Sequence, residues 1–132
     1  MEKITIGQLA KKVNVNLETI RYYERRGLLL EPPRNKSGHR EYSLEEVKRT
    51  KFIKRCQVLG FSLNEISELL SLRVGSGTTC GDVKARVKDK IMEVEKRIAD
   101  LEKIREALLR MSGKCIGNGP VGQCPILEEL YK

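Results

Sequence analysis

The four cysteines are the residues of this 132-residue chain best suited to metal or redox chemistry. Cys56 lies within a stretch of helical pattern, where a small buried hydrophobe is the expected role. The other three, Cys80, Cys115 and Cys124, lie in glycine-containing loops that flank one long stretch without glycine or proline. No C-x-x-C pair is present, so neither a zinc ribbon nor a thioredoxin-type motif fits.

The thiols of Cys80, Cys115 and Cys124 predict a site for a soft metal ion. The loop between Cys115 and Cys124 contains no His, Asp or Glu, so no harder ionisable ligand accompanies its sulfurs. A structural zinc site would need a fourth ligand. Three thiolates suit trigonal Hg(II), which we expect as the bound ion, with Pb(II), Cd(II) or Zn(II) as alternatives. Thiol-redox chemistry is a rival interpretation, because the loop could close a disulfide.

The long stretch, residues 82–112, has the pattern of a coiled-coil helix. Its apolar seam recurs at steps of four and three and consists of Val87, Ile91, Val94, Ile98, Leu101 and Leu108. Arg105 occupies the one missing step. A helix of this size is a rod of roughly 45 Å, which cannot fold back on so short a chain. We therefore expect it to pair with a second copy, either antiparallel or parallel, although packing within its own domain is an alternative.

Antiparallel pairing of two such helices would bring the three thiols together. Within one chain, Cys80 and Cys115 are separated by the full helix. In an antiparallel homodimer, Cys80 of one chain would lie beside Cys115 and Cys124 of the other. A twofold axis would then create two identical three-cysteine sites, one at each end of the helix pair.

The N-terminal part, residues 1–73, has the pattern of a winged helix-turn-helix. A short helix capped by Thr5 is followed by a turn at residues 14–16 and a second helix over 17–26. Residues 28–42 predict a small hairpin, or wing, with a basic tip, for which a plain linker is the alternative. Ser43 and Ser62 are then expected to cap two further helices, which end near residues 59 and 72.

Charge and composition limit the functions that this chain can have. The net charge is +8, and most of the basic surplus lies before residue 74, which indicates a nucleic-acid partner. We find no paired carboxylates, nucleophile–base set or phosphate loop, so an enzyme is not expected. No signal peptide and no apolar run of about 18 residues is present, which favours a cytoplasmic protein without membrane contact.

Together these segments resemble the MerR family of transcriptional regulators over nearly the whole chain. The resemblance is carried by IGQLA (6–10), TIRYYE (19–24), GLL (27–29), REY (40–42) and LGFSLNEI (59–66). Cys80, Cys115 and Cys124 stand where mercury-responsive members have their three ligands. Copper(I)-sensing members lack the cysteine before the long helix, and zinc-sensing members have an extra Cys or His beside the loop, where this chain has Lys114 and Ile116.

The resemblance implies a mainly α fold, in which a winged helix-turn-helix head precedes a long antiparallel coiled-coil dimerisation helix. It divides the chain into a DNA-binding domain (1–73), a hinge loop (74–81), the dimerisation helix (82–112) and a metal-binding loop with a short final helix (113–132). It also implies a homodimer on promoter DNA that represses without metal and activates RNA polymerase by distorting the DNA when metal binds. The DNA contacts carried over are Lys12, Glu18, Thr19, Arg21, Tyr22, Arg40 and Tyr42. His39 is added as a phosphate contact, because it lies in the basic wing with no cysteine near it in sequence.

Overall fold

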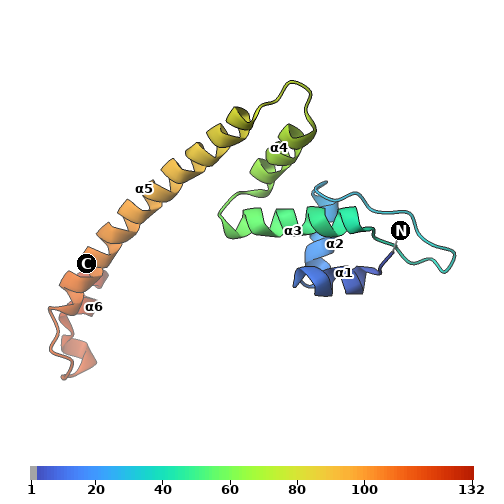
Figure 1. Cartoon of the computed structure of the whole chain (residues 1–132). Coiled ribbons are helices and arrows are strands. Elements are labelled where there is room, and N and C mark those ends of the chain that lie inside the picture. The colour runs from blue at the N-terminus through green and yellow to red at the C-terminus, as the bar shows by residue number, and fades with distance from the viewer. Residues whose placement is uncertain (1–2) are drawn as a thin grey trace. The chain divides into compact units, whose positions relative to one another are not determined.

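The computed structural model describes residues 3–132 and consists mainly of α-helices (Figure 1). The helices are α1 (Ile6–Val13), α2 (Leu17–Arg25), α3 (Leu44–Val58), α4 (Leu63–Val74), α5 (Cys80–Ser112), the short 3-10 helix η1 (Val121–Gln123) and α6 (Pro125–Tyr131). The predicted mainly α fold is confirmed. The chain divides into two compact units, Met1–Arg86 and Val87–Lys132, which are described separately. Within residues 3–132, no helix is both long and apolar enough to cross a membrane.

Local hydrogen bonds define the helix-turn-helix in the first unit. The Thr5 side chain accepts from the N–H of Gln8, whose side chain accepts from the N–H of Thr5, and this capping box starts α1. Asn14 ends α1 in the left-handed conformation, with φ of 61°, which asparagine tolerates well. Asn16 then caps α2 by accepting from the N–H of Thr19. Lys54 of α3 braces the turn by donating to the carbonyls of Val13 and Asn14 at 3.1 and 2.8 Å.

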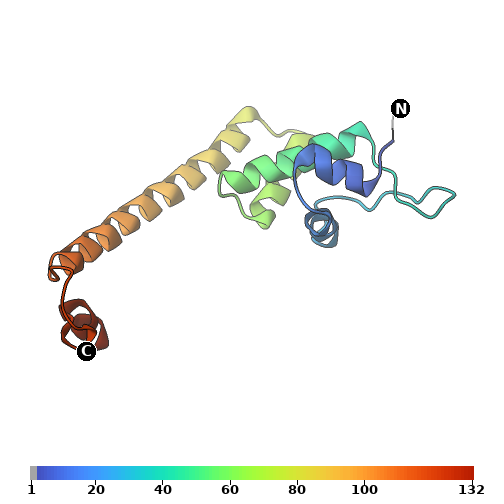
Figure 2. The ribbon, with the colours of Figure 1, turned by 90° about the horizontal axis from the view of Figure 1, so that it is seen from below.

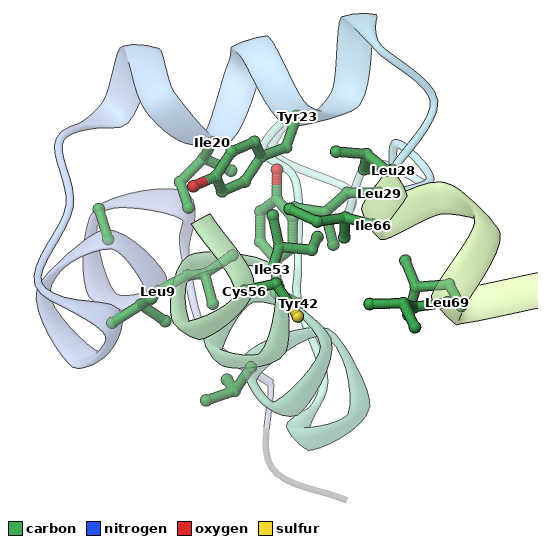
Figure 3. Close-up of a cluster of buried hydrophobic side chains, with 14 residues drawn as sticks. Leu9, Ile20, Tyr23, Leu28, Leu29, Tyr42, Ile53, Cys56, Ile66 and Leu69 are labelled. Atoms are coloured by element: carbon green, nitrogen blue, oxygen red, sulfur yellow. The ribbon is translucent and has the colours of Figure 1, made fainter. Parts of the chain in front are cut away.

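One hydrophobic core holds the helices of the first unit together (Figure 3). Leu9 of α1, Ile20 of α2 and Ile53 of α3 are fully buried in it, as is Ile66 of α4. The rings of Tyr23 and Tyr42 lie among these aliphatic side chains (Figure 3). Cys56 is also buried, at 8% exposure, which confirms its expected role as a small core residue. The core thus fixes α2 and α3 against α1 and leaves the outer face of α2 free.

The predicted wing is a hairpin-like loop between α2 and α3. Antiparallel bridges join Ile4 to Tyr42 and Arg34 to Arg40, and no longer strand is present in residues 3–132. The tip is closed by Asn35, whose side chain accepts from the N–H of His39. Gly38, at φ of 82°, makes the reversal that a residue with a Cβ would resist. Because only two isolated bridges pair its backbone, this loop needs side-chain contacts to fix its position relative to the helices.

Helix α5 begins earlier than the sequence pattern predicted. The predicted start was Asp82, but the structure makes Cys80 the first helical residue, so the loop after α4 covers only 75–79. The reason is that the Asp82 side chain accepts from the N–H of Thr79, at 2.8 Å, and thereby satisfies a donor ahead of the helix. Figures 1 and 2 show α5 as one unbroken helix.

The apolar seam of α5 is open to solvent in the single chain. Its six side chains, from Val87 to Leu108, retain 40–63% of their surface. Toward the end of the seam, Leu101 and Leu108 form an open apolar surface together with Ile104 and Leu109. The second unit therefore presents a continuous row of uncovered aliphatic side chains along one element. Such a row is typical of a helix that packs against another helix.

Candidate DNA-binding surface and cysteine site

The outer face of α2 carries polar side chains that the core leaves exposed. Glu18 and Arg21 are largely exposed and form an ion pair, in which the guanidinium donates to the carboxylate at 2.7 Å. Thr19 is half-buried, and its hydroxyl donates to the side chain of the N-cap Asn16 at 2.8 Å. All three predicted residues of this group therefore lie on one short helix, and Lys12 of α1 is exposed as well.

Tyr22 extends this face with two arginines that the sequence analysis did not select as DNA contacts. Its ring is 39% exposed, and the guanidinium carbons of Arg25 and Arg26 lie 5.7 and 5.8 Å from the ring centre. Arg26 also donates to the Tyr22 hydroxyl and to Asn64 of α4. These contacts hold two cations beside the aromatic ring. The spacing of three and four residues from Tyr22 was the available signal, since such residues share a helix face.

The three predicted contacts in the wing differ in accessibility. His39 is exposed near the tip, whereas the side chain of Arg40 is only 20% exposed. Tyr42 has no exposed surface at all, so its prediction as a direct DNA contact is wrong. Its ring is part of the core and its hydroxyl donates to Glu24, which lies 18 residues earlier in the sequence. Burial raises the pKa of Tyr42 to about 12, so this phenol is protonated at neutral pH.

Two of the three predicted metal ligands lie together in the second unit. Cys115 and Cys124 both line a hollow of about 310 Å³ formed by the loop between α5 and α6. The lining includes Lys114 and Gln123 but no acidic residue and no histidine. The Sγ atom of Cys115 accepts from the N–H of Gly117 at 3.4 Å. A Lys114–Glu129 ion pair at 3.7 Å connects the start of this loop to α6.

Cys80, the third predicted ligand, belongs to the first unit, where its side chain is exposed at the first turn of α5. All three cysteines outside the core are unpaired thiols. Within residues 3–132 of the single chain, no three His, Cys, Asp or Glu side chains form a cluster suited to a metal ion. Helix α5, which starts at Cys80, has 33 residues, and this corresponds to about 50 Å of helix.

Comparison with known proteins gives consistent matches over the whole chain. The family model for MerR HTH family regulatory proteins matches residues 4–72, and a second model, described as MerR, DNA binding, matches residues 47–111. The mercuric resistance operon regulatory protein of Bacillus cereus is 45% identical over 130 residues, which cover 98% of each chain. The HTH-type transcriptional regulator ZntR of Escherichia coli (strain K12) is 40% identical over 127 residues, covering 95% of this chain and 90% of that relative.

A solved structure has a similar fold. The transcription regulator PbrR691 from Ralstonia metallidurans CH34, in complex with lead(II), superposes with a TM-score of 0.82 at 34% identity and covers 96% of this chain and 98% of that chain. These relatives are transcriptional regulators, and they match both the helix-turn-helix head and the cysteine-containing tail. The chain therefore belongs to the MerR family of helix-turn-helix transcriptional regulators and is not an enzyme.

Proposed function

We propose that this chain is a metal-responsive regulator that binds promoter DNA as a homodimer and uses Cys80, Cys115 and Cys124 to recognise Hg(II). The observation that carries the proposal is the pair of thiols, Cys115 and Cys124, that line one hollow without an acidic or imidazole neighbour in its lining. The mercuric resistance regulator from Bacillus cereus, aligned over 98% of this chain, supports the same choice of metal.

The exposed face of α2 is the part of the chain best suited to read DNA. A polar helix that follows a tight turn is the element that enters the major groove in helix-turn-helix proteins. Its exposed residues Arg21 and Tyr22, with the half-buried Thr19, could reach base edges, and Arg25 and Arg26 add positive charge beside them. Lys12 of α1, Glu18 of α2 and His39 of the wing are also exposed and complete the proposed contact set. Basic residues of this kind supply most of the affinity by contacting phosphates.

The open seam of α5 supports the homodimer. Six aliphatic side chains spaced as coiled-coil a and d positions are 40–63% exposed in the single chain, and an identical helix would cover them. Antiparallel pairing would place the start of one α5 beside the end of the other. Cys80 of one chain would then complete the site formed by Cys115 and Cys124 of its partner, which the length of α5 prevents within one chain.

The donors fit a soft divalent cation better than a hard one. Three sulfurs suit Hg(II), whereas Mg(II) or Ca(II) would require oxygen ligands. When bound, the cation would supply the positive charge that lets three thiolates exist side by side. The cysteines would lose their protons, and the loop from Lys114 to Pro125 would be fixed to the partner's α5. Family membership supports the response: repression without metal, and activation of RNA polymerase through DNA distortion with it.

A transcription assay on a promoter that the protein binds, with Hg(II), Pb(II), Cd(II) and Zn(II) in parallel, tests this function. Transcription should rise with Hg(II) at the lowest concentration. Cys80→Ala, Cys115→Ala and Cys124→Ala should each abolish the response but retain DNA binding. Cys56→Ala is the matched control, because this cysteine is buried in the head, and its response should persist. A response to Hg(II) that survives in any of the first three variants would contradict the ligand assignment.

A thiol-redox regulator is the second candidate function, and the observation that favours it is the hollow shared by Cys115 and Cys124. Titration of free thiols separates the two functions. Under reducing conditions, a metal regulator should lose its reactive thiols when Hg(II) is added and recover them with a chelating dithiol. A redox regulator should instead lose thiols, and change its transcription, on treatment with a mild oxidant without metal.

A further inference from the structure

Glu24 of α2 has both carboxylate oxygens engaged by the wing. Its Oε1 accepts from Nη1 of Arg40 at 2.6 Å, and its Oε2 accepts from the hydroxyl of Tyr42 at 2.9 Å. The Glu24 side chain is only 8% exposed. Arg40 is further held by Glu31, with 3.1 Å between Nη2 and Oε1. Arg40 and Tyr42 lie 16 and 18 residues after Glu24 in the sequence. We call Glu24, Arg40 and Tyr42 the wing brace.

We propose that the wing brace fixes the wing relative to α2, and that Glu24 and Arg40 are positioning residues for DNA binding, not DNA contacts. The inference rests on the proposed DNA-binding function. It changes the role of Arg40, which the sequence analysis placed among the contacts. It also gives a role to Glu24, which is an acidic residue on the helix proposed to read DNA.

Charge and burial argue against Arg40 as a phosphate contact. Its guanidinium already faces two carboxylates, Glu24 and Glu31, so its charge is compensated within the head. Moving it to a phosphate would leave the Glu24 carboxylate largely buried, with only the phenol of Tyr42 as a donor. An incompletely paired buried carboxylate is costly. The interaction with Tyr42 and Glu24 also raises the pKa of Arg40, which remains charged in this position.

The brace matters because it ties the wing to α2. The bridges Ile4–Tyr42 and Arg34–Arg40 join the wing backbone to the N-terminal segment and to itself. The hydrogen bonds made by Arg34 and Asn35 close the tip but do not reach α2. Arg40 and Tyr42 flank the end of the wing that returns to the core, and the brace attaches this end to α2. A loop that is ordered before binding does not lose that conformational entropy on the DNA. The brace would therefore increase affinity without touching the nucleic acid.

DNA affinity and its salt dependence test the role of Arg40. The probe is a labelled duplex that the wild-type protein selects from a random pool of double-stranded DNA. Glu24→Gln and Arg40→Gln should each weaken binding roughly tenfold, the scale of reordering a few side chains. The double variant should be no weaker than the weaker single variant. Glu45→Gln on α3, an exposed carboxylate outside the brace, is the matched control and should bind normally.

Two outcomes would overturn the proposal. If Arg40 contacted phosphate in both subunits, Arg40→Gln would reduce the slope of log affinity against log salt by about two, whereas a positioning role leaves the slope unchanged. If Arg40 contacted phosphate, Glu24→Gln would also free its guanidinium from the Glu24 carboxylate, and the affinity for DNA would stay equal or increase.

Hydrogen exchange on the DNA-free protein separates this inference from the proposed function. In Glu24→Gln, the amides of residues 34–42 should exchange faster than in the wild type and in Glu45→Gln. Unchanged exchange would refute the brace even if the protein binds DNA. Faster exchange, combined with failure of the wild type to select any duplex, would support the brace and reject DNA binding.

Discussion

Truncating Ile98 at the centre of the α5 seam should weaken the dimer. Ile98 is 50% exposed in the single chain. Full burial of such a side chain is worth about 2–3 kcal/mol, so covering the exposed half contributes about 1 kcal/mol. The twofold axis doubles this to about 2 kcal/mol in the dimer, which corresponds to a roughly 30-fold higher dimer Kd for Ile98→Ala. The helix itself should not suffer, because alanine has the higher helix propensity.

Sedimentation equilibrium over a range of protein concentrations measures this effect. Met92→Ala is the matched control, because Met92 lies on the same helix, is 69% exposed and falls outside the seam. Its dimer Kd should stay within about twofold of the wild type, since its surface remains in solvent. The argument would be refuted if Ile98→Ala left the Kd unchanged, or if Met92→Ala raised it by a similar factor. A wild-type protein that stays monomeric at micromolar concentration would refute the pairing altogether.

Single side chains elsewhere in the chain give three more predictions. Arg105→Leu should lower the dimer Kd in the same sedimentation assay, since a charged residue at an a position costs stability, and a higher Kd would count against the seam. Because burial raises the folded pKa of Tyr42 from 10.0 to about 12, its contribution to stability is complete below pH 10 and lost as the pH rises to about 12. The free energy of unfolding, measured with urea at several pH values, should fall between pH 10 and about 12. In Tyr42→Phe this fall should be smaller. Burial raises the pKa of Glu46, but hydrogen bonds from Ser43 outweigh this and hold it below 4.5. Stability from Glu46 should therefore be present above pH 4.5 and lost below it, with a smaller acid dependence in Ser43→Ala.

Helix boundaries were the part of the fold that sequence predicted best, because local chemistry sets them. Ser43 and Ser62 were expected to cap two helices, and both do so in capping boxes with Glu46 and Glu65. Each box depends on residues three positions apart. The start of α5 was misplaced because the side chain of Asp82 reaches back to Thr79, which extends the helix to include Cys80.

The wing brace shows what the sequence could not reveal. Tyr42 was predicted to contact DNA because the family resemblance carried that role over to the wing. In the structure the Tyr42 hydroxyl donates a hydrogen bond to Glu24, which lies 18 residues earlier in the sequence, and the Tyr42 ring is buried in the core. No periodic pattern links these two positions, since their contact depends on how the wing returns to α2. The same reasoning applies to the bond from Arg26 to Asn64 of α4, which lies 38 residues away in the sequence.

The central claim is that each metal site takes sulfurs from two chains, and mixed dimers test it most directly. One protein carries Cys80→Ala, and the other carries Cys115→Ala with Cys124→Ala. Neither homodimer should retain Hg(II) against a competing monothiol such as glutathione. A heterodimer of the two variants has one intact site if Cys80 joins the partner's loop, so it should retain one Hg(II) per dimer. If the heterodimer retains none while the wild type retains two, or if either homodimer binds as the wild type does, the shared site is contradicted.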